Sequence, residues 1–417
     1  MGRSVSAHRA AIRGLLAPLA AREPEVRALV DALGLALARD VVAPVSLPPF
    51  DNSQMDGFAV RTADFRDPDV ATGGEGARDG AGGLRAFSLA ASIPAGAVPG
   101  PLSAGQAAPI MTGAMMPEGA DAVVPVEHAV PPRFPGPSPL GSADPVLLPE
   151  IKPGTFVRLV GSDVAEGAVV LAAGTRLGPA QLGLAAGLGL TEVSVWRPLR
   201  VAVVSTGAEL AEPGAVLGLG QIHDANGTLL TAALREAGLD ARATAVRSDE
   251  PAALREALDD AATWAELVVT TGGVSKGAFE ATKLALADDP VEFVHLAMQP
   301  GGPQGLGTVH GVPFLGFPGN PVSCWVSWEV LLRPVLAELL GAPAPRRRIV
   351  LPLAEPLDSP AGKLQVRRAR VDGGAVALVG GPGSHLLGAL AASDALVLVP
   401  EDVTDLPPGA NVEVWLL

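Results

Sequence analysis

Three short turns carry the residues of this 417-residue chain that are best suited to chemistry. In each turn an apolar run passes directly into glycine and small polar residues, which is typical of a strand that ends tightly. If the three strands are parallel members of one sheet, their carboxyl ends open on the same edge and the turns meet there. Glycine permits close approach to the backbone, and N–H groups ahead of a helix suit an anion. The residues expected to contact a ligand are Ser205, Thr206 and Gly207; Gly272, Gly273 and Ser275; and Pro318, Gly319, Asn320 and Pro321.

Several carboxylates accompany these turns, among them Glu209, Asp224, Asp249 and Glu280. Acidic groups beside a phosphate-binding turn indicate a hydrated Mg²⁺, which one or two carboxylates hold together with substrate oxygens. Other interpretations stay open. Ser248-Asp249-Glu250-Pro251 is also a good helix start, with a capping residue followed by proline. Asp224 or Asn226 could likewise cap the helix expected from Gly227.

The segment that must position these residues reads as α/β. From Leu199 onward, apolar runs alternate with helical patterns of 10–15 residues, which predicts βαβ units around a parallel sheet. The expected strands are Val201–Ser205, Ala241–Val246, Leu267–Thr271 and Phe314–Phe317, and the expected helices are Gly227–Ala237, Pro251–Ala262, one beginning near Phe279, and about Val322–Leu340.

The segments before and after this α/β segment have different sequence patterns. Residues 7–42 predict two helices, the second over about Glu23–Asp40, because its apolar residues recur at spacings of three and four. Short β-like runs separated by proline and glycine follow from Val41 to Leu148, and the last 70 or so residues return to short strands. The predicted fold class is therefore multidomain α/β plus β, with a central α/β domain with a parallel-type sheet, a β-rich N-terminal half and a small C-terminal β domain.

Composition excludes several classes of protein. The formal net charge of −14 argues against a broad nucleic-acid or anionic-membrane surface, because phosphate binding needs clustered Lys and Arg. A single cysteine, Cys324, rules out an internal disulfide and a zinc site built from cysteines, and a reducing, cytoplasmic setting fits best. Cys324 is expected on a helix and buried. The most apolar stretch, Leu182 to Leu190, is about half the length needed to span a membrane.

A series of motifs in fixed order resembles those of the molybdopterin molybdenumtransferases, the MoeA family that includes the gephyrin E domain. The series covers some 400 residues, so it is far more specific than any one glycine turn. Its members are Pro48 to Val60 with Asp56; Met111-Thr112-Gly113 with Pro117 to Val124; Arg158 with Gly161-Ser162-Asp163; Ser205 to Leu210; Gly220 to Asn226; Gly272 to Ser275; Pro318 to Ser323; and Gly383-Ser384-His385.

The resemblance implies a cytoplasmic homodimer whose active-site cleft is shared between chains, and it makes the molybdopterin adenylyltransferase a candidate partner. It implies four domains: an elongated domain of residues 1–47 and 149–197, a small β-rich domain 48–148, a molybdopterin-binding α/β domain 198–342, and a C-terminal β-barrel domain 343–417. The implied reaction inserts molybdate into adenylyl-molybdopterin with Mg²⁺-dependent hydrolysis and release of AMP.

The same resemblance assigns roles residue by residue. The implied catalytic residues are Asp56, Thr112, Asp163 and Glu209; the implied metal ligands are Glu209, Asp249 and Glu280; and Asp224, Asn226, Arg368 and Ser384 join the turn residues in binding substrate. No protein nucleophile is needed, because the sulfurs and oxygens of the substrates do the work.

Two departures from the family pattern bear on activity. Gln299-Pro300-Gly301-Gly302-Pro303 stands where the family has Lys-Pro-Gly-Lys-Pro, and Glu280 stands where the family has Asp. Hydrogen bonds to charged groups contribute about 1.5–3 kcal/mol each, so losing both lysines would weaken anion binding about 10²–10⁴-fold unless something compensates. Lys276 could supply part of that compensation.

The missing lysines leave two further functions open. One is a non-catalytic relative that binds molybdopterin or its adenylate, or that scaffolds other pathway proteins. The other is an adenylyltransferase-type nucleotide enzyme on the same α/β fold, although a single-domain adenylyltransferase would not need the β-rich first half or the C-terminal β domain.

Overall fold

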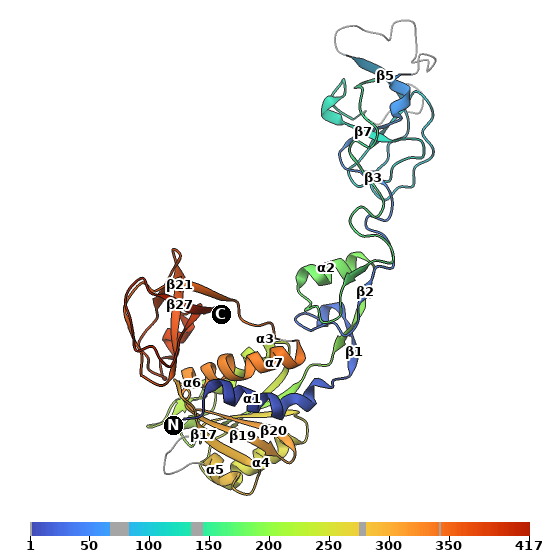
Figure 1. Ribbon diagram of the computed structural model, residues 1–417. Coiled ribbons are helices and arrows are strands. Elements are labelled where there is room, and N and C mark those ends of the chain that lie inside the picture. The colour runs from blue at the N-terminus through green and yellow to red at the C-terminus, as the bar shows by residue number, and fades with distance from the viewer. Residues whose placement is uncertain (1, 67–82, 135–144, 275–280, 342) are drawn as a thin grey trace. The chain divides into compact units, whose positions relative to one another are not determined.

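The computed structural model describes residues 2–66, 83–134, 145–274, 281–341 and 343–417 (Figure 1). The chain forms two compact units. The first comprises Met1–Arg39, Ala173–Pro179 and Glu192–Leu417, and the second comprises Asp40–Ala172 and Ala180–Thr191. Within the described residues, no helix is long and apolar enough to cross a membrane.

The first unit is built on a six-stranded sheet. Its order is β15-β12-β16-β20-β19-β17, and the first four of these strands are parallel. β19 runs antiparallel to both β20 and β17. The parallel sheet expected from the sequence is therefore present in the strands that carry the three turns, and one reversed strand extends it. The bounds are β12 (Arg200–Thr206), β15 (Asp240–Val246), β16 (Leu267–Thr271), β17 (Val291–His295), β19 (Pro303–Val309) and β20 (Val312–Phe317).

Alternation along the central strand explains why helices cover both faces of this sheet. Val201 and Val203 belong to one buried core, and Ala202 and Val204 belong to another, because successive side chains of a strand point to opposite faces. Such doubly buried strands are typical of parallel sheets. The first core contains α1 (Val5–Leu16), α3 (Ala225–Glu236), α6 (Pro321–Val326) and α7 (Arg333–Leu340), and the second contains α4 (Pro251–Ala262) and the residues after α5 (Ala281–Ala285).

The helix expected over Val322–Leu340 is interrupted. A π-helical segment, Ser327–Leu332, separates α6 from α7. Glu329 in this segment is fully buried, and the Arg346 guanidinium donates to its two carboxylate oxygens at 2.8 and 3.0 Å. A buried carboxylate needs such partners to offset the loss of water. Sequence periodicity alone does not distinguish this wider turn from an α-helix.

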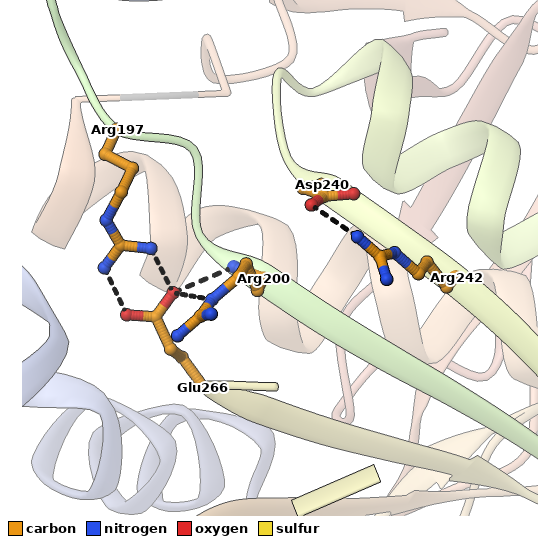
Figure 2. Close-up of polar contacts among 5 residues, drawn as sticks. All are labelled: Arg197, Arg200, Asp240, Arg242 and Glu266. Carbon is orange, nitrogen blue, oxygen red and sulfur yellow. Dashed lines mark hydrogen bonds and ion pairs between the residues drawn. The ribbon is translucent and has the colours of Figure 1, made fainter. Parts of the chain in front are cut away.

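An ion cluster ties the amino-terminal ends of the strands together, at the edge opposite the three turns (Figure 2). Glu266, just before β16, accepts hydrogen bonds from the Arg197 guanidinium at 2.6 and 3.0 Å and from the Arg200 backbone N–H at 3.1 Å. Burial raises the pKa of Glu266, but these bonds lower it by more, so the net shift is downward. Arg242 and Asp240 form a further pair, 3.6 Å apart, on neighbouring β15.

The second helix predicted over Glu23–Asp40 is wrong. This segment forms β1 (Pro24–Ala28), which pairs antiparallel with β11 (Glu192–Trp196), followed by a 3₁₀ turn, Leu29–Asp31. The apolar residues that suggested a helical face do not form one buried stripe: Val26 is 61% exposed and Val30 87% exposed, whereas Leu37 is fully buried. Backbone pairing with a strand some 165 residues away decides the structure here, and local periodicity cannot detect it.

The C-terminal part of the first unit is a second sheet, ordered β18-β23-β25-β27-β21 with β24 added beside β23. Its first strand, β18, comes from the chain between β17 and β19, so this sheet is joined to the α/β sheet through residues 296–302. Its bounds are β18 (Met298–Gln299), β21 (Arg348–Pro352), β23 (Leu364–Asp372), β24 (Ala375–Leu378), β25 (Ala395–Val399) and β27 (Asn411–Leu416), with β22 (Leu357–Asp358) paired to β26 (Asp405–Leu406) and a short helix, α8 (Leu387–Ala391).

The second unit contains a five-stranded sheet ordered β7-β4-β6-β5-β8. Phe58 and Phe87 are fully buried in its core among aliphatic residues. The bounds are β4 (Gly57–Val60), β5 (Leu84–Leu89), β6 (Gln106–Ile110), β7 (Ala122–Pro125) and β8 (Val146–Pro149), and the smaller elements are β2 (Val41–Val42), β3 (Asn52–Ser53), β9 (Val157–Arg158), β10 (Val169–Leu171) and α2 (Pro179–Gly187).

Candidate functional site

A cavity of about 1090 Å³ lies at the carboxyl ends of β12, β16 and β20. All three turns line it, as the sequence predicted. The predicted turn residues that line it are Ser205, Thr206, Gly207, Gly272, Gly273, Pro318, Gly319, Asn320 and Pro321. Ser275 lies outside the described residues.

The turns pack backbone against backbone, which explains their glycines. Gly272 has φ +100°, and a Cβ there would lie 2.6 Å from the carbonyl oxygen of Thr206. A Cβ on Gly319 would lie 3.3 Å from the Cα of Gly272. The Gly272 N–H donates to the carbonyl of Phe317 at 3.1 Å. Only glycine combines this φ with such close approach.

Asp224 and Asn226 combine a structural contact with a place in the cavity wall. Asp224 caps α3, since its Oδ1 accepts from the Gly227 N–H at 2.9 Å. Asn226 Nδ2 donates to the carbonyl of Gly319 at 2.7 Å, which fixes α3 to the turn after β20. Both residues also line the cavity. The capping interpretation of Asp224 is thus confirmed, and its predicted contact with substrate stays a prediction.

Asp249 and Glu209 meet at the turn after β12. Asp249 Oδ1 accepts from the backbone N–H of Ala208 at 3.1 Å. It does not cap α4, whose N-cap is Glu250. The Glu209 carboxylate lies over Gly207, 2.4 Å from the position a Cβ would take there. Both carboxylates line the cavity, so two of the groups predicted to hold metal lie at the same turn, Glu209 within it and Asp249 in contact with it from the loop after β15.

This donor set suits Mg²⁺ better than a metal held entirely by protein. No group of three or more His, Cys, Asp or Glu side chains that could hold an ion occurs among the described residues. Mg²⁺ commonly takes one or two carboxylates and completes its shell with water and phosphate oxygens. Glu280, the third predicted ligand, lies outside the described residues, as does Lys276.

The loop that departs from the family pattern forms another wall of the cavity. Its residues Gln299 to Pro303 all line it. Buried Gln304 holds the loop, because its Nε2 donates to the carbonyl of Gly301 and to Ser327 Oγ, both at 2.8 Å. At Gly302 a Cβ would lie 2.7 Å from both Cε1 and Nε2 of His295. The imidazole therefore occupies the space next to position 302.

The C-terminal domain completes the wall. Ser384 lines the cavity as predicted, and its carbonyl accepts from the Val322 N–H at 3.0 Å. Arg368 is only 2% exposed and is not among the described lining residues. Its guanidinium donates to the carbonyls of Gly381 and Gly383, so it supports the loop that carries Ser384.

Two lining residues carried no sequence signal. Lys363 and His295 line the cavity, but neither belongs to a glycine turn, a carboxylate cluster or one of the motifs named above. Lys363 could have been found only from the pairing of β23 with β18, which is a long-range contact.

The remaining predicted catalytic residues belong to the second unit. There the Asp56 carboxylate accepts from both the backbone N–H and the Oγ1 of Thr112, each at 2.7 Å. These two hydrogen bonds lower the pKa of Asp56. Asp163 is exposed in the loop after β9 and donates its backbone N–H to the carbonyl of Leu47 at 3.0 Å. The structure thus joins Asp56 to Thr112, and their catalytic roles stay predictions.

Fold and site together define an α/β protein with a cavity lined by glycine turns at one sheet edge, and with β domains on both sides of the α/β segment in the chain. Three family profiles match: the MoeA N-terminal region (domain I and II) at residues 3–189, the probable molybdopterin binding domain at 202–338, and the MoeA C-terminal region (domain IV) at 350–417.

Similar proteins agree over the full length. Molybdopterin molybdenumtransferase 2 of Mycobacterium tuberculosis is 43% identical over 430 residues, covering 99% of each chain. The molybdopterin molybdenumtransferase of Haemophilus influenzae is 32% identical over 402 residues, covering 93% of this chain and 92% of its own. The crystal structure of the molybdopterin biosynthesis MoeA protein of Pyrococcus horikosii superposes with a TM-score of 0.75 at 29% identity, covering 100% of this chain and 99% of its own. The chain therefore belongs to the MoeA family of molybdopterin molybdenumtransferases, transferases of molybdenum cofactor biosynthesis, as its motifs indicated.

Proposed function

We propose that this protein inserts molybdate into adenylyl-molybdopterin, with Mg²⁺-dependent hydrolysis of the adenylate and release of AMP. The observation that carries the proposal is the convergence of three glycine turns on one cavity, with one carboxylate on the turn after β12 and a second that contacts this turn from the loop after β15. An adenylylated ligand offers phosphate oxygens to such turns, and backbone N–H groups stabilise the charge that develops on them. The cavity volume, about 1090 Å³, suits a ligand larger than a mononucleotide.

Glu209 and Asp249 are the residues that would hold Mg²⁺. When bound, the ion supplies positive charge to phosphate oxygens in the bond that is cleaved. The chain's own contribution is positional. The Ala208 N–H fixes the Asp249 carboxylate, and Asn226 fixes the turn at Gly319, so the donors are in place before the substrate arrives.

The protein supplies no nucleophile in this scheme. Cys324 is buried on α6, and burial raises the pKa of its thiol, so the thiolate is not formed at neutral pH. Sulfur and oxygen atoms of the two substrates carry out the exchange.

The alternatives have weaker support. Relatives that match this chain over its whole length are named molybdenumtransferases, whereas an adenylyltransferase would leave the β domains without a use. The test is AMP release from adenylyl-molybdopterin with Mg²⁺, in the presence and absence of molybdate. We expect molybdate to stimulate release, and Glu209→Gln to abolish it. Tight substrate binding without molybdate-dependent release would instead support a non-catalytic relative.

We further propose that the protein acts as a cytoplasmic homodimer, with Asp56, Thr112 and Asp163 of one chain completing the cavity of the other. Mixing the inactive variants Asp56→Asn and Glu209→Gln tests this arrangement. A random heterodimer has one intact composite site, so about a quarter of wild-type activity should return when subunits exchange. No recovery on mixing, with heterodimers verified by mass, would place both residues in the same chain's site.

A further inference from the structure

The cavity has acidic side chains in one part of its wall and a basic side chain in another. Glu209, Asp224 and Asp249 gather on the turns after β12 and before α3 and α4, while Lys363 is the one lysine or arginine among its described lining residues. A dianion such as molybdate is repelled by the carboxylate end and needs a cation. The end that carries Lys363 is the only described part of the wall that offers one.

The backbone holds Lys363 beside the loop where the family lysines are absent. Lys363 directly precedes β23, and the Leu364 N–H donates to the carbonyl of Ala297 at 2.9 Å. The next residue, Gln365, pairs with Gln299 and donates its Nε2 to Gln299 Oε1 at 3.2 Å. The lysine thus lines the cavity from the C-terminal domain, two residues before Gln365, the residue that pairs with Gln299.

Position 302 is crowded by a neighbouring side chain. The His295 ring lies 2.7 Å from where a Cβ on Gly302 would be, closer than side chains pack. The Leu296 N–H donates to the carbonyl of Gly302 at 2.7 Å, which keeps the two residues together. A lysine at position 302 would therefore require the His295 ring to turn away.

Lys363 has an ammonium group available for a ligand. It forms no hydrogen bond or ion pair with any residue in the described part of the chain, and its side chain is half-buried. Ser384 and His385 line the same cavity from the same domain and offer hydrogen-bond donors. A cation with two further hydrogen-bond donors is a suitable set for a tetrahedral oxyanion.

We propose that Lys363 is the cation that binds molybdate in this protein and that it takes over the role of the lysines absent at Gln299 and Gly302. This inference rests on the proposed function, because it takes molybdate as the second substrate. It assigns the residue that sets molybdate affinity to the C-terminal domain instead of the loop after β18.

The test is the molybdate concentration that gives half-maximal AMP release, compared across four lysine variants at saturating adenylyl-molybdopterin. Lys363→Gln should raise that concentration about 10- to 100-fold, the loss of one charge-assisted hydrogen bond, and Lys363→Arg should recover most of it. Lys152→Gln, an exposed lysine of the second unit, is the matched control and should not change it. Lys276→Gln tests the rival assignment. A large effect at Lys276 with none at Lys363 would overturn the inference.

A second readout separates this inference from the proposed function. The melting temperature of the wild type and of Lys363→Gln is measured against molybdate concentration, with no adenylate present. If molybdate stabilises the wild type but not Lys363→Gln, the result supports Lys363 as the residue that binds molybdate, even if AMP release proves independent of molybdate. Equal stabilisation of both proteins refutes Lys363 while leaving the transferase reaction intact. If molybdate stabilises neither protein and AMP release from the wild type is independent of molybdate, both the inference and the proposed function are wrong.

Discussion

Replacing Gly272 by alanine tests whether the three turns hold one another by direct backbone contact. Gly272 has φ +100°, and a Cβ there would lie 2.6 Å from the carbonyl oxygen of Thr206 and 3.4 Å from its Cγ2. Two costs follow. A side chain in left-handed backbone costs about 1–2 kcal/mol, and forcing a methyl group against a fixed carbonyl costs about 1–3 kcal/mol.

The cost of the contact between a side chain at position 272 and Thr206 can be measured separately, because the chain contains a matched glycine with left-handed backbone and no such contact. Gly311 has φ +79° in the turn between β19 and β20 of the same sheet, and a Cβ there would meet nothing within 4 Å. Gly311→Ala should therefore lose about 1–2 kcal/mol of unfolding free energy, and Gly272→Ala about 2–5 kcal/mol. The difference between the two variants measures the packing of Gly272 on Thr206.

Urea denaturation followed by tryptophan fluorescence gives both free energies, since Trp328 is fully buried in this domain. Gly272→Ala should also weaken binding of adenylyl-molybdopterin, whereas Gly311→Ala should not. Equal losses of stability in the two variants, with unchanged ligand affinity in both, would refute the conclusion that the turns are packed against each other at the site.

Three further predictions concern single side chains. Thr112→Val removes the hydroxyl that donates to Asp56, so the pKa of Asp56 should rise toward its ordinary value, as followed by ¹³C NMR of the carboxyl. Because the folded-state pKa of Asp56 is lowered, its contribution to stability is present above the unfolded-state pKa and is lost as pH falls through the folded-state value. In Thr112→Val that contribution should be smaller, and its loss should be complete at a higher pH than in the wild type. Asn226→Ala breaks the bond to the Gly319 carbonyl and should lower the unfolding free energy by about 1–3 kcal/mol, with Asn226→Asp, which lacks the donor, showing a similar loss in urea titrations. Cys324 should not react with a thiol reagent until the domain unfolds, so a rapid stoichiometric reaction of the native protein would contradict its burial.

Sequence reasoning identified the α/β domain well because its signals are local. The apolar run Leu267–Thr271 and the proline-started helix Pro251–Ala262 occur in the structure with the same bounds. The convergence of the turns followed from the general geometry of parallel strands. A turn needs only its own glycines and its preceding strand to be recognised, and those are contiguous in the chain.

The failures came from long-range contacts. The segment after Glu23 has helical periodicity, yet it pairs with β11, and Val26 remains exposed. The π-helical segment depends on Arg346 reaching Glu329 from a later part of the chain. Lys363 reaches the cavity only because β23 pairs with β18. In each case the residue or strand that determines the structure is too far away in the sequence for a local pattern to predict the contact.

The pairing of β18 with β23 has a thermodynamic consequence. Together with the bond from the Val322 N–H to the Ser384 carbonyl, it makes the cavity wall out of two domains, and these domains also share one buried core, to which the C-terminal domain contributes Val366, Leu396 and Trp415. A ligand that touches both walls binds only while the domains are docked, so its binding free energy also opposes their separation. At a ligand concentration one hundred times Kd this amounts to about 2.7 kcal/mol. Because the shared core already couples the two domains, they are expected to unfold in one step, and bound substrate is expected to raise the temperature of that step.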